Sequence, residues 1–253
     1  MTYFQLNTSA KPVLTLNIVI AMLFLFSSCK NNKYEDVLAA KQYEYQPLAI
    51  GNYTIFDVDS THFNFINPST QQTDTFHFQQ MEKITDTMYD NEGRLNYRFE
   101  LFRRADATAT WRLWKVWYGL TTSTSFERQE DDLRFAKLIF PPTADVHWNG
   151  NKYVPATDSN VFKLYLNWDY HYTSIGTPAT IGTNSFTECL FVSQVDEENL
   201  IDKKLSKEIY AKNVGLVHKE FWVINKQDVV SPWSNPYKAN GDHVIMNVNT
   251  YGH

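Results

Sequence analysis

Cysteine, basic clusters and catalytic motifs are scarce in this sequence. The chain has two cysteines among 253 residues, too few for the disulfide framework that stabilises many small secreted domains. Cys189 lies in the apolar segment 186–192, where no neighbouring group would activate a thiol, so we expect it to be buried and unreactive. Lys and Arg number 23 against 28 Asp and Glu, a net charge of −5. Without a basic stripe, this balance argues against a nucleic-acid partner.

Motifs for nucleophilic hydrolysis, zinc proteolysis and phosphate binding are also absent from the sequence. The seven histidines are scattered, and none stands at metal-ligand spacing from another His, Cys or carboxylate. The sequence therefore predicts no metal ion and no cofactor. The acidic run Glu127–Asp132 lacks the glycine and the alternating oxygens of a calcium loop, so we interpret it as a solvated hairpin tip. Together these absences argue against an enzyme.

The longest apolar run lies near the start of the chain and is short for a membrane span. Residues 13–26 contain only two polar side chains, a length that suits a signal-peptide core, whereas a membrane helix needs about 20 apolar residues. Two small residues, Ser27 and Ser28, come next, followed by Cys29. This order resembles the lipobox of bacterial lipoproteins, in which the cysteine is acylated and begins the mature chain. The box departs from the common pattern at Phe26, where Leu is usual.

The lipobox resemblance implies a signal peptide at residues 1–28, lipidation of Cys29, an anchor and polar tether at 29–45, and a β-rich body at 46–253. Several acyl chains anchor a protein durably, because each buried CH₂ contributes about 0.8 kcal/mol. The alternative is an ordinary secretory signal with an incidental cysteine. In surface-displayed lipoproteins, acidic residues typically follow the cysteine directly. Here none does. We therefore expect the body to face the periplasm from the outer membrane.

Aromatic residues and alternating segments dominate the body. Seven Trp, 15 Tyr and 17 Phe favour strands. Residues 73–89 and 94–104 predict a hairpin around the turn 90–93, because apolar and polar side chains alternate with a period of two. Residues 161–172 alternate in the same way and predict another strand. The Gly- and Thr-rich segment 173–185 is interpreted as a flexible loop.

Short connections between strands define the expected fold class. We count about ten to twelve strands, joined by turns that favour antiparallel neighbours. Residues 110–120 carry apolar side chains on both faces, which indicates a strand covered on both sides. Residues 196–206 fit either a short helix or a loop that leads into a strand. The sequence predicts a mainly β, single-domain protein with an antiparallel half-open barrel or strongly curled sheet, and a β-sandwich is the alternative.

Three motifs mark the body of the chain. They are a Tyr-x-Pro-Leu-x-x-Gly-x-Tyr opening at 45–53, a Trp-Asn-Gly-Asn sequence at 148–151 and a Tyr-Ala-Lys-Asn-Val-Gly element at 210–215. Together they resemble a family of uncharacterised Bacteroidota lipoproteins. The resemblance covers most of residues 45–224. It implies a lipoprotein of the cell envelope and carries no activity, cofactor or site residue.

The aromatic excess supplies the candidate binding residues, which are Trp111, Trp117, Trp168 and Tyr170. A curled sheet would provide a cavity for them to line, and the alternative is that they fill the core. We therefore expect a non-catalytic binding module for an apolar or glycan ligand, with no nucleic-acid partner. A structural or assembly accessory that acts through contacts with an envelope protein is the alternative function.

Two short triplets are candidate modification sites. Asp59-Ser60-Thr61 and Asp86-Thr87-Met88 resemble the Asp-Ser/Thr-apolar site of O-glycosylation in Bacteroidota. Ser60 and Thr87 would be the modified residues, although triplets of this length also occur by chance.

Overall fold

The computed structural model describes residues 41–67, 70–155 and 164–253, all of which belong to the unit Leu38–His253. The predicted signal peptide 1–28, Cys29 and most of the predicted tether 29–45 lie outside the described residues. Inside the described ranges, no helix has the length and apolar character needed to cross a membrane.

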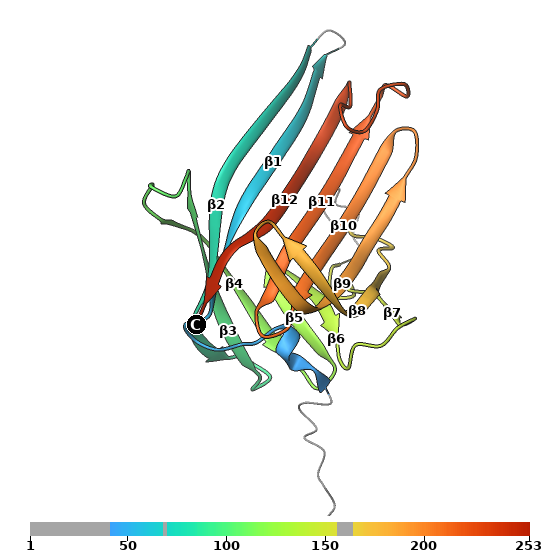
Figure 1. Ribbon diagram of the computed structural model, residues 1–253. Coiled ribbons are helices and arrows are strands. Elements are labelled where there is room, and N and C mark those ends of the chain that lie inside the picture. Colours follow the sequence, from blue (N-terminus) through green and yellow to red (C-terminus); the bar gives the residue numbers. More distant parts are fainter. Residues whose placement is uncertain (1–40, 68–69, 156–163) are drawn as a thin grey trace, which may run out of the picture. The chain divides into compact units, whose positions relative to one another are not determined.

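The described residues form one antiparallel sheet of twelve strands (Figure 1). A short 3₁₀ helix, Tyr43–Tyr45, precedes it. The strands are β1 (Tyr53–Asn67), β2 (Thr70–Tyr89), β3 (Leu95–Arg104), β4 (Arg112–Thr121), β5 (Ser125–Glu130), β6 (Leu133–Ile139), β7 (His147–Trp148), β8 (Tyr170–Ile181), β9 (Asn184–Glu198), β10 (Asp202–Ala211), β11 (Gly215–Lys226) and β12 (Ala239–Gly252). Their order is β6-β5-β4-β3-β2-β1-β12-β11-β10-β9-β8-β7, so β6 and β7 are the edges.

The two ends of the sheet approach each other and give it the curl that the sequence predicted. The Ala136 amide of β6 donates to the Gly150 carbonyl after β7 at 2.8 Å. The Trp148 indole donates to the Ala136 carbonyl at 2.8 Å. The Tyr172 hydroxyl of β8 accepts from the Ile139 amide at 2.9 Å and donates to the Ile139 carbonyl at 2.7 Å. The fold prediction is confirmed as a single curled, open antiparallel sheet, and the alternative of two packed sheets does not apply.

Several predicted elements agree with the structure and others differ. The hairpin around residues 90–93 is β2–β3, and the Asp90 carboxylate accepts the amides of Glu92 and Arg94 at 2.9 Å in its turn. The predicted loop 173–185 is instead part of the β8–β9 hairpin. Three register shifts in β8 break its alternation, because a β-bulge places two residues opposite one. The period-two signal that identifies a strand is therefore missing there.

The predicted strand 161–172 also differs from what is observed. Strand β8 begins only at Tyr170, and residues 164–167 form a turn. Of the two alternatives for residues 196–206, the structure shows the loop that leads into a strand. No helix occupies the described segment 196–206, because β9 continues to Glu198 and β10 begins at Asp202. The Asn199 side chain accepts the amides of Ile201 and Asp202 at 2.9 and 2.8 Å. The local charge pattern resembled a helix start, but pairing between strands decides the structure here.

The main core lies inside the curl. It joins buried side chains from strands that are not neighbours in the sheet, including Phe56 of β1, Leu138 of β6 and Leu190 of β9. These side chains meet only because the sheet bends round them. Tyr45, with 1% of its surface exposed, belongs to the same core, so the packed body already includes the end of the predicted tether.

Candidate functional site

The concave face of the sheet continues beyond the core. On β1, Phe56 and Val58 belong to the core, and Ser60 lies two residues further along the same face. On β2, Phe78 pairs with Val58, and Phe76 pairs with Ser60. At this level the core ends and a cleft of about 720 Å³ opens. The cleft lies where β1 and β2 extend past β3, because β3 pairs with β2 only as far as Gln79, whereas the β1–β2 pairing continues to Thr70.

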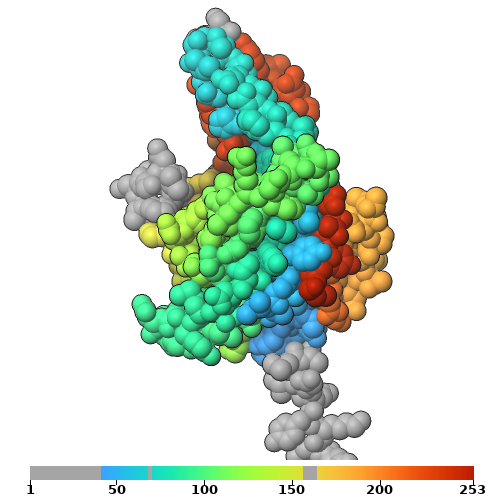
Figure 2. All heavy atoms as spheres, turned by 90° about the vertical axis from the view of Figure 1, so that its left-hand side faces the viewer, coloured from blue at the N-terminus to red at the C-terminus, as the bar shows by residue number. Residues whose placement is uncertain are grey.

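Apolar side chains form much of this concave cleft. Its walls come from β1, β2 and β12, from the end of β3, from the start of β4 and from the connection between β3 and β4. Phe76 is 56% exposed, Leu113 55% and Trp114 39%. Figure 2 shows the end of the β1–β2 hairpin (cyan) standing above the green segment that contains β4. Large apolar side chains that no described part of the chain covers are the usual lining of a ligand site.

Two arginines, Arg103 and Arg112, border the apolar surface of the cleft. Arg104 is also a lining residue, but its Nε donates to Gln79 Oε1 at 2.8 Å on the opposite face of β2. The Arg103 guanidinium carbon lies 3.1 Å from the ring centroid of Trp114 and 4.4 Å from that of Phe78. Burial lowers the pKa of Arg103 to about 10, although nearby Asp131 acts in the opposite direction, so the side chain is cationic at neutral pH. The cleft therefore combines an apolar surface with fixed positive charge.

A hydrogen-bonded chain leads from the cleft into the interior. Arg103 Nε donates to Gln80 Oε1 at 3.1 Å, and Gln80 Nε2 donates to Glu82 Oε1 at 3.2 Å. Arg128 Nη2 donates to Glu82 Oε2 at 2.6 Å. Phe76, Phe78, Gln80 and Glu82 alternate along β2, so they share the concave face. The cleft arginine is thereby held in place by buried polar groups.

Alternating charges continue this chain across the inside of the sheet. Arg128 and Lys137 each approach Glu130, at 3.6 and 3.4 Å, and Lys137 also binds Glu208 at 3.0 Å. Burial alone would raise the pKa of Glu130, but Lys137, Lys219 and Arg128 outweigh it and lower that pKa to about 2. Burial would lower the pKa of Lys137, but Glu130 and Glu208 raise it instead. Each buried charge therefore has an opposite partner, as burial requires.

The interpretation of Glu127–Asp132 as a solvated hairpin tip is wrong for Glu127, Arg128 and Glu130. Glu127 and Arg128 are 3% and 5% exposed, within β5, and only Asp131 and Asp132 form the turn. On the other side of β5, the Tyr153 hydroxyl donates to Glu127 Oε1 at 2.8 Å, and Arg134 also binds this carboxylate. The sequence did not show that both faces of β5 are covered, so its charged residues were interpreted as exposed to solvent.

The four aromatic residues proposed as pocket lining lie in different places. Trp168 and Tyr170 are 5% and 1% exposed in the main core, with ring centroids 6.3 Å apart. Trp111 lies next to Arg104, whose guanidinium carbon is 4.2 Å from its ring centroid. The Trp117 indole donates to Asp131 Oδ1 at 3.2 Å. None of the four lines the concave cleft, although Trp168 borders a separate surface hollow.

Sequence reasoning did not single out the aromatic residues that do line the cleft, Phe76, Phe78 and Trp114. The available signal was weak, since Phe76 and Phe78 alternate with polar residues as in any half-buried strand. Their exposure depends on where β3 and β4 end, which the sequence does not show.

The two candidate glycosylation residues both lie within strands. Ser60 lines the concave cleft and is partly buried. Thr87 is partly buried in β2, and its amide donates to Asp86 Oδ1 at 2.8 Å. Their modification remains a prediction, and a glycan on Ser60 would fill the cleft.

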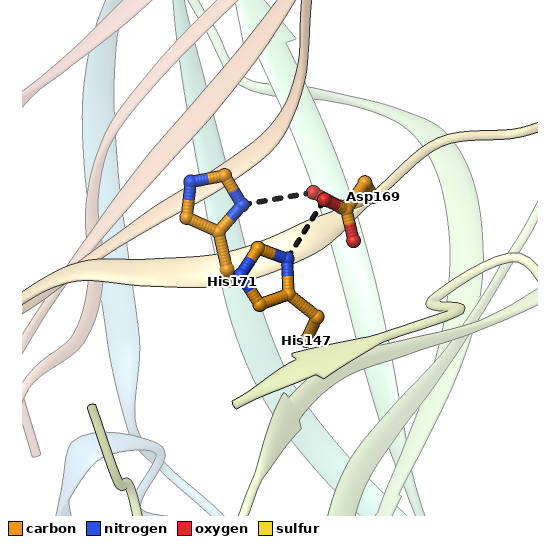
Figure 3. A group of neighbouring side chains, drawn as sticks. All are labelled: His147, Asp169 and His171. Carbon is orange, nitrogen blue, oxygen red and sulfur yellow. Dashed lines mark hydrogen bonds and ion pairs between the residues drawn. The ribbon is translucent and has the colours of Figure 1, made fainter. Parts of the chain in front are cut away.

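A second group of polar side chains lies at the β7 edge. His147, Asp169 and His171 each offer a possible metal-ligand atom, and these atoms lie within 4.8 Å of one another (Figure 3). The sequence analysis predicted no metal ligands, since 22 residues separate His147 from Asp169. The detectable part of the pattern was Asp169-x-His171, which puts two donors on one strand face.

The fold and the cleft define a class: an all-β protein with one open, curled antiparallel sheet and a hollow on its concave side. No family model matches the sequence, and no curated protein matches it. A solved structure from Bacteroides fragilis, of a protein classed as exported and with a YmcC-like fold, is 13% identical with a TM-score of 0.37. The match covers 82% of this chain and 98% of that chain. A likeness of this degree assigns no activity.

Proposed function

We propose that the protein is a lipid-anchored, non-catalytic binding module of the cell envelope. Its anchor is Cys29, its body faces the periplasm from the outer membrane, and its concave cleft takes an apolar chain that ends in an acidic group. The observation that carries the proposal is the exposed apolar lining of the cleft together with Arg103 and Arg112. The signal-like segment before Cys29 supports the location.

The side chains around Trp114 favour an apolar ligand over a glycan. Sugars bind proteins largely by stacking on open aromatic faces, but the Trp114 ring already has Arg103 at 3.1 Å and Lys115 Nζ at 4.4 Å from its centroid. Phe76 and Leu113 offer apolar area without hydrogen-bonding groups. A cation beside such a surface pairs with an acidic head group while the chain covers the apolar residues.

The test is ligand binding by the full chain extracted in mild detergent. Native mass spectrometry of protein from its own host is expected to show a copurifying acidic amphiphile. Binding of the fluorescent fatty acid cis-parinaric acid should weaken about tenfold in Leu113→Ser, because the variant removes apolar contact area. Leu200→Ser is the matched control, since Leu200 is 69% exposed and is not among the cleft residues.

Arg112→Gln tests the charge separately. It should weaken binding of the fatty acid and leave binding of the corresponding fatty alcohol unchanged. No binding by the unaltered protein, or equal losses in Leu113→Ser and Leu200→Ser, would contradict the proposal. Recovery of one stable protein partner with an unliganded cleft would favour the assembly-accessory alternative instead.

A further inference from the structure

His147, Asp169 and His171 form a compact donor group on the outside of the β7–β8 ladder. His147 of β7 and His171 of β8 occupy directly paired positions, and their rings stack with centroids 4.8 Å apart and planes inclined by 25°. His147 Nδ1 lies 2.7 Å from Asp169 Oδ2, and His171 Nδ1 lies 3.0 Å from the Asp169 backbone oxygen. Figure 3 shows both imidazoles directing a nitrogen toward Asp169.

We propose that these three residues bind a Zn²⁺ ion. Two imidazoles and one carboxylate are a common zinc donor set, with bonds of about 2.0–2.2 Å. Facing residues on antiparallel strands have Cβ atoms about 4.5–5.5 Å apart, which allows their side chains to share one ion. The three donor atoms already lie within 4.8 Å of one another, so small side-chain rotations complete the site.

Buried neighbours hold the donor residues in position. His147 precedes Trp148, whose indole donates to the Ala136 carbonyl at 2.8 Å. Asp169 and His171 alternate with Trp168, Tyr170 and Tyr172, which are all buried in the core. The alternation of β8 therefore fixes the aromatic residues inside and presents the donors outside. Backbone positions set by packed neighbours are the condition for a preorganised site.

The same group differs from the other His–Asp pairs of the described residues. His62 Nδ1 lies 2.8 Å from Asp242 Oδ1, and His77 pairs with Asp59. Each of these pairs is exposed and contains a single imidazole, so it supplies two donors at most. The β7–β8 group adds a second imidazole, which separates a chelating site from a surface ion pair.

The ion would serve two purposes at this edge. Strand β7 contains only His147 and Trp148 and pairs with β8 at two positions, so a metal bridge would reinforce a short edge strand. The group also borders a hollow of about 550 Å³ that includes Asn149, Lys152 and Asn167. Three protein donors leave the fourth position of a tetrahedral Zn²⁺ ion open for water or an anionic group.

The experiment is a metal titration of the full chain in mild detergent after removal of bound metal with EDTA. Calorimetry with ZnCl₂ should show one ion per chain, and Co²⁺ should give the visible absorption of a protein-bound ion. His171→Ala and the more conservative Asp169→Asn should each weaken Zn²⁺ binding by at least about tenfold. Near-UV circular dichroism verifies that each variant keeps its tertiary packing.

His62→Ala is the matched control, because it removes an exposed imidazole from a simple His–Asp pair. Zn²⁺ should raise the Tm of the unaltered protein and of His62→Ala, but not that of His171→Ala, because a ligand stabilises only the state that binds it. The proposal is overturned if the unaltered protein binds no more Zn²⁺ than His171→Ala, or if His62→Ala loses binding to the same extent.

Discussion

Glu130 lies between two cations inside the sheet, 3.4 Å from Lys137 and 3.6 Å from Arg128. The sequence places it in an acidic run beside a turn, where solvation is the usual state. In the fold, its neighbours come from β6 and from its own strand, and Lys137 is bound in turn by Glu208 of β10. No local pattern shows that residues 130 and 208 share one lysine, because the contact depends on the curl of the sheet.

The depressed pKa of Glu130 predicts acid sensitivity. Its carboxyl titrates near 4.5 when unfolded but at about 2 in the folded protein, so between these values the unfolded state binds more protons. Above the pKa of the unfolded chain, the ionised Glu130 carboxylate stabilises the folded protein by about 3 kcal/mol. This stabilisation is lost as the pH falls toward the pKa of Glu130 in the folded protein. Urea denaturation between about pH 5 and pH 2 should show the free energy of unfolding falling with pH.

Two variants separate Glu130 from acidic residues at the surface. Glu130→Gln should be less stable than the unaltered protein at neutral pH, because Lys137 and Arg128 lose a charged partner, and it should have a shallower pH dependence. Glu197→Gln removes a carboxylate that is 57% exposed and lies 3.7 Å from Lys204, and it should leave the slope unchanged. Equal slopes in Glu130→Gln and the unaltered protein would contradict the prediction.

At the scale of elements, β6 shows how the open sheet protects an edge. An exposed edge strand offers unpaired amides and carbonyls to other chains. Here the Tyr172 hydroxyl satisfies both the amide and the carbonyl of Ile139, and Trp148 satisfies the Ala136 carbonyl. Side chains from β7 and β8 thus stand in for a neighbouring strand, so the curl is maintained without a continuous ladder.

Tyr172→Phe is expected to destabilise the protein by about 1–3 kcal/mol, because the Ile139 amide and carbonyl lose their partner. Chemical denaturation measures the loss, and light scattering should show more self-association through the freed β6 edge. Tyr89→Phe is the control, since Tyr89 is 70% exposed and its hydroxyl should contribute little. A Tyr172→Phe variant as stable as Tyr89→Phe would mean that the closure does not depend on this hydroxyl.

The accuracy of the element predictions follows the regularity of the strands. The β2–β3 pairing has a single register shift, between Ile84 and Asp86, and this hairpin was predicted nearly to its ends. Strand β8 has three register shifts, and its polar residues were interpreted as a loop. The segment before Tyr170 alternates in sequence but turns in the structure at residues 164–167. Alternation therefore identifies a strand best where register shifts are few.

At the scale of the whole molecule, the proposed location depends on Cys29, a residue outside the described ranges. We expect Cys29→Ser to move the protein from the membrane pellet to the soluble fraction, because a hydroxyl does not receive the acyl chains that hold it there. Cell fractionation with detection of the protein in each fraction measures this. Ser28→Ala is the control, since it keeps the cysteine and a small residue before it. Continued pelleting of an unprocessed Cys29→Ser chain would contradict the proposed anchor.

The sequence by itself determined the fold class and the predicted cellular location of the protein, because both depend on local patterns. Period-two alternation and short turns specify antiparallel strands, and an apolar run that ends at Cys29 indicates an anchor. The concave cleft, the buried charges of β5 and the β7–β8 donor group were decided only by the tertiary structure. Each combines residues distant in the chain, such as Ser60 with Trp114 or His147 with His171. Their proximity follows from strand register and curl, which nonlocal packing sets.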